Sequence, residues 1–570
     1  MTECRALTIM TRPNERYEQE MASNSNEADV VVVGGGVAGL STAVNAAHLG
    51  LSVILVEKGA ACGGTSRKAS AGMLIPNNYY QREHGIPDPK QDFIRFLARV
   101  GRPLLYNPDA EFYGLPEWEF DLIETYYDNA AKAIEHLDAI GALRTIPQPA
   151  WSSYNEVAED ASPFARGIWP RREDGSVGNG ADFVDDMVAA AQRLGVVVRT
   201  RQRVADVLLD AEDRVVGVIA EGADGARERF RARKGVVFAT GGFTHNAELT
   251  RQYLNGMYIG GCTALTSEGD FVPLAQALGI PLINMHAAFG APVVLEQSLA
   301  RDPDLVSSFT TPGDSILTVN KYGDRVGNEK ATYNDRTTQH FRWEPVKAEY
   351  PNFLVFPVWD QRNTDLYHRV IRPGMESAGN FIPAADGDWR YVVKADTLEE
   401  LADGLRARLA AVADATGGIE LADDFVEHLR ASIERYNGFA RDGFDADFRR
   451  GGMAIEHHMH GPQAPDNQSE NKTMFPLAEQ GPYYATILVP GAIDTKGGPR
   501  VNRRLQVLGS RGKPVPGLYG LGNCVASASG QAYWSGGSTF GPYIAFGYVA
   551  AHSLAEEPDH GEPVRSILED

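Results

Sequence analysis

The 570-residue sequence has few cysteines and an excess of negative charge, and both features exclude classes of protein. Its four cysteines, Cys4, Cys62, Cys262 and Cys524, form no C-x-x-C pair, so the sequence predicts neither a disulfide framework nor a structural zinc site. The 54 Lys and Arg are outnumbered by 75 Asp and Glu, which gives a net charge of −21. Nucleic acid is therefore not expected as a partner, because phosphate binding needs clustered cations.

Long hydrophobic runs are also missing. The most apolar stretch, residues 30–56, is broken by Asn45, His48 and several glycines, whereas a membrane-spanning helix needs roughly 20 apolar residues. Residues 1–28 are polar and lack the apolar core of a signal peptide, so we expect an unstructured segment there. The sequence therefore predicts a cytoplasmic protein without a transmembrane segment.

A metal site is not expected either. The run Glu456-His457-His458-Met459-His460 carries no set of cysteine or carboxylate ligands, and consecutive histidines point in divergent directions on a helix or a strand. The run is expected to be a solvated loop.

A strand–turn–helix–strand pattern occupies residues 29–57. The strand ADVVVVG, a glycine turn, a helix ending at Gly50 and the strand SVILVEK follow one another within about 30 residues, the length of a βαβ unit. Such a unit predicts parallel strands joined by a right-handed crossover.

The turn in this unit has the pattern G-x-G-x-x-G, formed by Gly34, Gly36 and Gly39. These glycines permit a tight turn, close approach of a pyrophosphate, and contact between helix and strand. Val37 and Ala38 lie in the same turn, where the helix that follows presents free N–H groups and its positive dipole end to phosphates.

An acidic residue ends the second strand. Glu57 follows Gly39 by 18 residues (57 − 39) and is placed to accept hydrogen bonds from ribose hydroxyls. Later glycine and hydroxyl clusters at residues 63–72, 239–242 and 517–523 are more than NAD requires, so they favour FAD, with NAD as the alternative.

The composition also divides the chain. Strand-like sequences between residues 196 and 242 predict an antiparallel meander that returns to the main sheet, and two amphipathic helices are expected at 397–415 and 422–443. The predicted fold is α/β: a Rossmann-like FAD-binding domain, with a parallel sheet plus a β-meander, interrupted by an α+β cap. The expected segments are 1–28 (unstructured), 29–290 (FAD-binding, first part), 291–479 (substrate-binding cap), 480–555 (FAD-binding, second part) and 556–570 (acidic tail, frayed).

From Asp29 to Leu554 the chain resembles the FAD-dependent family that includes fumarate reductase flavoproteins and 3-ketosteroid dehydrogenases, and within it the 3-ketosteroid Δ1-dehydrogenase type. The motifs that carry the resemblance are GGTSRKASAGMLIPNN (63–78), ATGGFTHN (239–246), SEGDF (267–271), NEKATYND (328–335), DTKGGPRVN (494–502) and GNCVASASGQAYWSGGSTFGP (522–542).

The resemblance implies an extended FAD, with its adenosine near Glu57 and Val204 and its flavin ring near Gly72, Asn523 and residues 538–541. No histidine occurs between residues 63 and 72, so the FAD is expected to be non-covalent. The expected FAD-binding residues are Gly34, Gly36, Val37, Ala38, Gly39, Glu57, Lys58, Gly63, Gly64, Thr65, Ser66, Ala71, Gly72, Val204, Ala239, Thr240, Gly241, Gly522, Asn523, Ser538, Thr539 and Gly541.

The resemblance also implies a reaction on CH–CH groups beside a cyclic ketone, such as a steroid ketone. In its Y-x-x-x-G motif, the Tyr533 hydroxyl and the Gly537 N–H hold the ketone oxygen. Tyr333 takes the α-proton, Tyr154 assists it, and flavin N5 takes the β-hydride. The electron acceptor is unknown, with a quinone or a carrier protein as candidates.

Several alternatives stay open. The arginine and histidine that fumarate reductases use are absent from SGQAYWSGGS and PGAIDTKGG, which favours an apolar ketone over a dicarboxylate. Trp534 and Ser535 depart from the Δ1 pattern and leave a Δ4-(5α)-ketosteroid or a cyclohexanone dehydrogenase as alternatives. The two remaining alternatives are an ene-reductase and a flavin-binding receptor without turnover.

Overall fold

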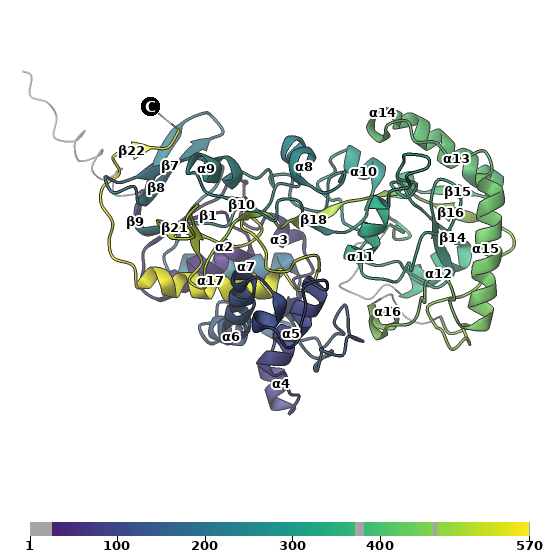
Figure 1. Ribbon diagram of the computed structural model, residues 1–570, viewed down its shortest axis with the longest axis horizontal. Coiled ribbons are helices and arrows are strands. Elements are labelled where there is room, and N and C mark those ends of the chain that lie inside the picture. The colour runs from purple at the N-terminus through teal and green to yellow at the C-terminus, as the bar shows by residue number, and fades with distance from the viewer. Residues whose placement is uncertain (1–25, 371–380, 460–463, 569–570) are drawn as a thin grey trace, which may run out of the picture.

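The structure is a computed structural model that describes residues 26–370, 381–459 and 464–568. Most of the segment expected to be unstructured, residues 1–28, lies outside these ranges. Its last two residues, however, open strand β1 (Glu27–Val33). Figure 1 shows two bodies: one contains β1 and its neighbours, and the other, here called the cap, contains helices α13 and α15.

The first body is built on a nine-stranded mixed sheet. Strand β1 pairs in parallel with β2 and β9, and β2 pairs in parallel with β6, which confirms the predicted βαβ unit and the α/β fold class. The path through the sheet is β22-β7-β8-β9-β1-β2-β6, and β21 and β20 extend from β9. The bounds are β2 (Val53–Val56), β6 (Val197–Arg199), β7 (Gln202–Leu209), β8 (Val215–Gly222), β9 (Arg227–Phe238), β20 (Gln506–Leu508), β21 (Pro514–Gly520) and β22 (Arg565–Ser566).

The predicted meander is confirmed. Strands β7, β8 and β9 pair antiparallel in turn, and the far half of β9 then runs parallel beside β1. Each of the three strands contains two or more valines, and short polar turns separate them, which is why the chain reverses direction at these points.

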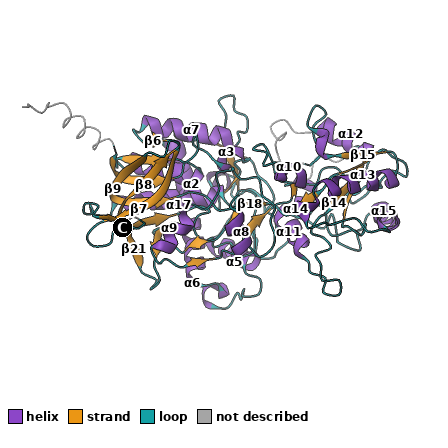
Figure 2. Ribbon diagram, turned by 90° about the horizontal axis from the view of Figure 1, so that it is seen from above, coloured by secondary structure: helices purple, strands orange, loops and turns teal. Residues whose placement is uncertain are grey.

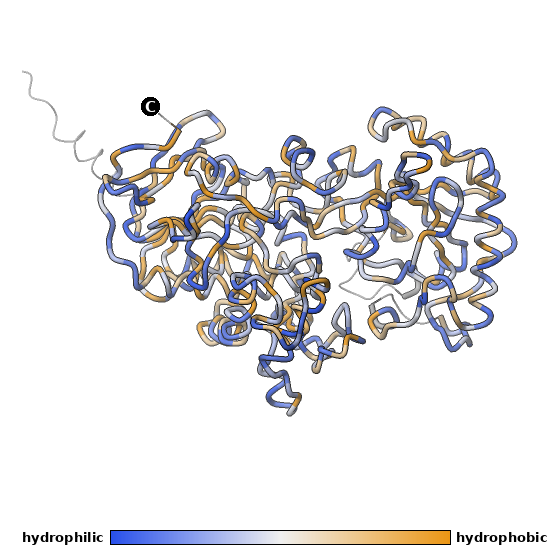
Figure 3. Tube along the Cα trace, viewed as in Figure 1, coloured by the Kyte–Doolittle hydropathy of each residue, from blue (hydrophilic) through white to orange (hydrophobic). Residues whose placement is uncertain are grey.

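Helix α2 (Val37–His48) packs against α17 (Phe540–Ala555) and α7 (Gly180–Arg193). A Cβ atom added to Gly547 of α17 would lie 2.6 Å from the Cβ of Ser41, so the absent side chain lets the two helices meet closely. The strands of this sheet lie at the end of the molecule opposite the cap helices (Figure 2), and hydrophobic residues are concentrated in the inner strands and in α17 (Figure 3).

The cap has its own four-stranded sheet, in the order β13-β14-β16-β15. Helices α13 (Leu398–Ala411) and α15 (Phe425–Asp442) cover it and confirm the two predicted amphipathic helices. The strands are β13 (Ile316–Val319), β14 (Phe356–Asp360), β15 (Val393–Ala395) and β16 (Tyr483–Ala485). Residues 483–485 therefore belong to the cap sheet, although the sequence placed them after the boundary at 480. Their backbone groups pair with β14 and β15.

Two chain segments connect the bodies, and they pair with each other. Strand β11 (Ala288–Gly290) runs antiparallel to β18 (Ala492–Thr495), and β12 (Val293–Val294) to β17 (Leu488–Val489). The division of the chain into an interrupted FAD-binding domain and a cap stays a prediction. It places the first domain boundary after residue 290, between β11 and β12.

Two expectations about irregular segments are wrong. The tail after residue 556 is not frayed within the described range, because β22 pairs with the edge strand β7, and the His560 N–H donates to the Arg233 carbonyl at 2.6 Å. Residues 454–459 form helix α16 (Ala454–Met459) rather than a loop, and the buried Glu456 carboxylate accepts hydrogen bonds from Asn328 and from the Gly451 N–H. His460 lies outside the described residues.

The remaining helices are short or peripheral. They are α3 (Thr65–Lys68), α4 (Tyr79–Glu83), α5 (Lys90–Gly101), α6 (Glu117–Ala139), α8 (Ala247–Tyr253), α9 (Phe271–Ala277), α10 (Leu295–Leu299), α11 (Tyr333–Thr338), α12 (Gln361–Val370) and α14 (Ala413–Thr416). In the part of the chain that the structure describes, no helix has both the length and the apolarity needed to cross a bilayer.

Candidate active site

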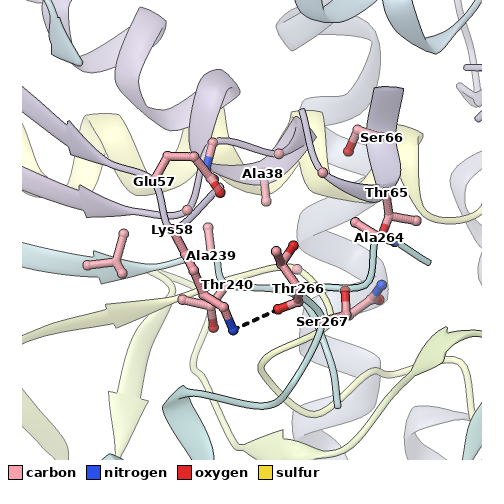
Figure 4. Close-up of a pocket in the computed structure, with 18 of the residues that line it drawn as sticks. Ala38, Glu57, Lys58, Thr65, Ser66, Ala239, Thr240, Ala264, Thr266 and Ser267 are labelled. Atoms are coloured by element: carbon pink, nitrogen blue, oxygen red, sulfur yellow. Dashed lines mark hydrogen bonds between the residues drawn. The ribbon is translucent and has the colours of Figure 1, made fainter. Parts of the chain in front are cut away.

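A pocket lies at the carboxyl ends of β1, β2 and β9, at the edge of the sheet where nucleotides bind in folds of this kind (Figure 4). Its lining contains these expected residues: Gly34, Gly36, Val37, Ala38, Glu57, Lys58, Gly63, Gly64, Thr65, Ser66, Val204, Ala239, Thr240, Gly241, Gly522 and Asn523. The structure thus gathers residues from four distant parts of the chain around one space.

The glycine turn has the backbone shape that the motif requires. Gly34 adopts a φ of 102°, which disfavours residues with a side chain. A Cβ on Gly39 would lie 1.9 Å from the Gly34 carbonyl oxygen, so Gly39 lets α2 pack against the turn and does not itself line the pocket. The Val37 N–H donates to the Ser66 hydroxyl at 2.9 Å, which ties the two glycine loops together.

Glu57 is fixed at the end of β2. Its carboxylate accepts hydrogen bonds from the Gly35 N–H at 2.7 Å and from the Gly59 N–H at 2.5 Å. Lys58 points to the opposite wall, where it donates to the Thr266 carbonyl at 3.0 Å and pairs with Glu268 at 2.5 Å and Asp270 at 2.9 Å. The carboxylate therefore lies beside the glycine turn, while the lysine charge is neutralised.

The chemistry of this pocket fits a dinucleotide. The amide oxygen of Gln202, which lines the pocket, is buried without a hydrogen-bond partner among the described residues, so it offers an acceptor to a ligand. A Cβ on Gly64 would have no atom nearer than 4.0 Å, which leaves its backbone open to a bound group. Polar N–H groups and open glycines in one cleft are what a pyrophosphate needs.

The sequence reasoning missed several lining residues: Gly35, Gln202, Ala264, Thr266, Ser267, Asp270, Asp494 and Tyr543. Asp494 connects two segments that line the pocket. Its carboxylate accepts hydrogen bonds from the Gly242 N–H at 2.9 Å and from the Asn523 amide at 3.0 Å. Burial raises the pKa of this carboxyl group, and those hydrogen bonds oppose the rise. The motifs SEGDF and DTKGG contain Ser267 and Asp494, so a closer reading of them could have found both.

Six expected residues do not line this pocket: Gly39, Ala71, Gly72, Ser538, Thr539 and Gly541. The segments that contain the last five nevertheless meet, because the Leu74 N–H donates to the Gly537 carbonyl at 3.3 Å. A Cβ on Gly72 would lie 2.6 Å from the Trp169 ring, and one on Gly541 would lie 2.3 Å from the Leu74 carbonyl oxygen. In this structure, both glycines therefore permit close packing.

The two tyrosines with predicted catalytic roles lie together. Tyr333 begins α11 in the cap, Tyr533 lies in the loop before α17, and their ring centroids are 5.2 Å apart. Phe289 packs edge-on against Tyr533 at 5.3 Å, and Phe309 packs against Tyr333 at 5.1 Å. Ala291 and Ile493 complete the cluster in which the two tyrosine side chains pack.

Electrostatics keep both phenols protonated. Burial raises the pKa of Tyr333 well above its usual value, and the nearby Tyr533 and Tyr154 hydroxyls raise it further. Burial also raises the pKa of Tyr533, although hydrogen bonds from Thr539, Tyr333 and the Gly537 N–H partly offset this. The Gly537 N–H and the Tyr533 hydroxyl thus lie within hydrogen-bonding distance of each other, and their predicted roles toward a ketone stay a prediction.

Tyr154 approaches from a loop of the first body. Its hydroxyl donates to Asp335 Oδ1 at 3.1 Å, and Asp335 is the third residue of α11. Burial and the adjacent Asp335 raise the pKa of Tyr154. All four residues with predicted catalytic roles are therefore in one region.

The chain belongs to the FAD binding domain family, whose model matches residues 29–540. It is similar to a 4-oxocyclohexanecarboxylate 2-dehydrogenase of Sinomonas cyclohexanicum, with 30% identity over 95% of this chain and 96% of the relative. It is also similar to a 3-oxosteroid 1-dehydrogenase of Mycolicibacterium smegmatis strain ATCC 700084 / mc(2)155, with 27% identity over 93% of this chain and 97% of the relative.

Among solved structures, a 3-ketosteroid delta1-dehydrogenase from Sterolibacterium denitrificans, in complex with 1,4-androstadiene-3,17-dione, has the same fold. Its TM-score is 0.76 at 23% identity, over 93% of this chain and 99% of that one. The predicted family, fold class and FAD cofactor are thereby confirmed, and the protein is an FAD-dependent oxidoreductase.

Proposed function

We propose that this oxidoreductase introduces a carbon–carbon double bond next to the carbonyl group of an apolar cyclic ketone, a reaction on CH–CH groups. The observation that carries the proposal is the pair Tyr333 and Tyr533, whose rings lie 5.2 Å apart within an otherwise apolar cluster. A neutral ketone is the substrate that such a cluster accommodates without burying an unpaired charge.

The chain supplies two groups for the ketone oxygen. The Tyr533 hydroxyl and the Gly537 N–H donate to it and stabilise the negative charge that develops as the α-carbon loses its proton. Both donors belong to one short segment, in which the Gly537 carbonyl is held by the Leu74 N–H. Because both tyrosines are buried, these hydrogen bonds act in a medium of low polarity and are strengthened there.

Tyr333 takes the α-proton, and Tyr154 assists it. Because burial raises the pKa of Tyr333, this residue must pass its own phenolic proton on as it receives the new one. The glycine turn, Glu57 and the lining of the pocket would hold the FAD non-covalently, and the bound cofactor would supply the two-electron oxidant for the β-hydride.

A panel of ketones tests the proposal. Purified protein loaded with FAD is mixed without oxygen with 4-androstene-3,17-dione, cyclohexanone, 4-oxocyclohexanecarboxylate and fumarate. Bleaching of the flavin absorbance by a cyclic ketone, with an enone as product, is expected. A spectrum that no ketone changes would contradict the proposal and favour a flavin-binding receptor.

The same panel decides between neighbouring functions. The relative that acts on 4-oxocyclohexanecarboxylate makes a monocyclic ketone a specific second candidate substrate. Oxidation of the reduced enzyme by fumarate, without bleaching by ketones, would favour an ene-reductase. The position of the new double bond in the steroid product separates Δ1 from Δ4 chemistry. The cytoplasmic location and a quinone or carrier-protein acceptor stay predictions.

A further inference from the structure

Each turnover leaves a proton inside the protein. Tyr333, the proposed base, is only 7% exposed, so the α-proton cannot pass from it directly to bulk water. Tyr154 and Asp335 are both partly exposed, and the Tyr154 hydroxyl donates to Asp335 Oδ1 at 3.1 Å. This hydrogen bond joins Tyr154 to a partly exposed carboxylate on α11, the helix that begins at Tyr333.

Within the described residues, the Asp335 carboxylate is held by hydrogen bonds and not by an ion pair. Two hydroxyl groups donate to it, Thr332 Oγ1 to Oδ2 at 3.0 Å and Tyr154 to Oδ1, and the side chain of Asn334 is a further hydrogen-bond partner. Asp335 thus differs from acidic side chains such as Asp88 and Glu329, which pair with arginine. An aspartate without a cation is the better proton acceptor, because no positive charge stabilises its anionic form.

The neighbouring Arg336 does not neutralise the Asp335 carboxylate. The Arg336 guanidinium is held by the Ser308 carbonyl at 2.6 Å, the Thr311 hydroxyl at 3.1 Å and the Ala331 carbonyl at 3.0 Å. Burial raises the pKa of Asp335, and the hydrogen bonds from Thr332 and Tyr154 oppose the rise.

We propose that Asp335 is the terminal proton acceptor of the active site and acts through Tyr154 on the base Tyr333. As Tyr333 Oη gains the α-proton, it gives its own proton to Tyr154 Oη, and the Tyr154 O–H bond breaks as a new bond forms to Asp335 Oδ1. Asp335 then releases the proton to water, so one proton leaves for each hydride removed. This inference rests on the proposed function.

Asn155, which follows Tyr154 in the same loop, provides a control. Asn155 Oδ1 accepts from the Ile455 N–H at 3.2 Å, so Asn155 also joins the loop to the cap but carries no transferable proton to Tyr333. If Asp335 only holds the loop against the cap, Asn155→Ala should resemble Asp335→Asn. If Asp335 moves a proton, only the Asp335 variant should lose activity.

The test measures anaerobic flavin bleaching in stopped flow, with the best ketone of the panel and FAD-loaded protein. Asp335→Asn is expected to slow bleaching at saturating ketone by 10-fold or more, and Asp335→Glu to keep at least a third of the rate. Asn155→Ala should stay within 2-fold of the wild type. Added formate should accelerate Asp335→Ala but not the wild type, because a small carboxylate can replace the missing group.

Tyr154→Phe removes the donor of the hydrogen bond between Tyr154 and Asp335. This variant replaces the Asp335 variants in the test if those do not fold or do not retain FAD. Bleaching within 2-fold of the wild type in Asp335→Asn, or an equal loss in Asn155→Ala, would overturn the relay and leave the proposed function intact. Bleaching within 2-fold in Tyr154→Phe would overturn the relay and the assisting role of Tyr154, but not the proposed reaction. A wild-type protein that no ketone bleaches would overturn both.

Discussion

At the scale of single residues, the groups that line the FAD pocket differ from the tyrosines proposed to act on the ketone. Tyr533→Phe removes one of two donors to the ketone oxygen, so the rate of ketone-driven bleaching should fall by about 10²–10³-fold, as expected for one oxyanion donor. Affinity for FAD should not change, because Tyr533 does not line the dinucleotide pocket. Anaerobic stopped flow measures the rate, and fluorescence titration of the apoprotein measures FAD binding.

The matched control at this scale is Tyr483→Phe. Tyr483 is also a buried tyrosine, and its hydroxyl donates to the Ala478 carbonyl at 3.0 Å within the cap. Its loss should leave bleaching near the wild-type rate. Equal rates in Tyr533→Phe and the wild type would show that the ketone oxygen is held elsewhere.

At the scale of secondary-structure elements, the contact between α2 and the glycine turn governs FAD binding. Gly39→Ala places a Cβ 1.9 Å from the Gly34 carbonyl, so α2 must move away from β1. We expect thermal unfolding at a lower temperature and weaker FAD binding, with a cost of about 1–3 kcal/mol for overpacking. Gly438→Ala in α15 is the control: its Cβ meets no atom within 4 Å, so stability should hold or rise by about 0.5–1 kcal/mol.

At the scale of the whole molecule, the cap contains a buried charge cluster that makes stability depend on pH. Glu329 pairs with Arg325 at 2.8 Å and with Arg450 at 3.1 Å. Burial alone would raise its pKa, but these arginines lower it from 4.5 to about 2. The folded form thus holds the proton more weakly than the unfolded chain, and the stabilisation present above pH 4.5 is lost as the pH falls toward 2.

The resulting prediction concerns urea unfolding of the FAD-loaded protein. Glu329→Gln should be less stable than the wild type at pH 7 by about 3 kcal/mol, and this difference should shrink as the pH falls from 4.5 toward 2. Glu399→Gln, which disrupts an exposed pair with Arg430, should show little difference at any pH. A difference between Glu329→Gln and the wild type that stays constant over this range would contradict the assignment.

The sequence by itself determined the parts whose physics is local. The βαβ unit with its glycine turn, the meander and the amphipathic helices α13 and α15 follow from side-chain periodicity and from residues that punctuate the backbone, so short segments sufficed to predict them. Glu57 was found for the same reason, because its distance from the turn along the chain fixes its place at the strand end.

Only the tertiary structure decided which distant segments meet. The pairing of β16 with cap strands, the return of the tail along β7 and the link of Asp494 to Gly242 and Asn523 depend on contacts between residues far apart in sequence. No local pattern encodes such contacts, since they arise when buried polar groups find partners during packing. The meeting of Tyr154 with Asp335 across the two bodies is of this kind, so the sequence could name Tyr154 but not the carboxylate beside it.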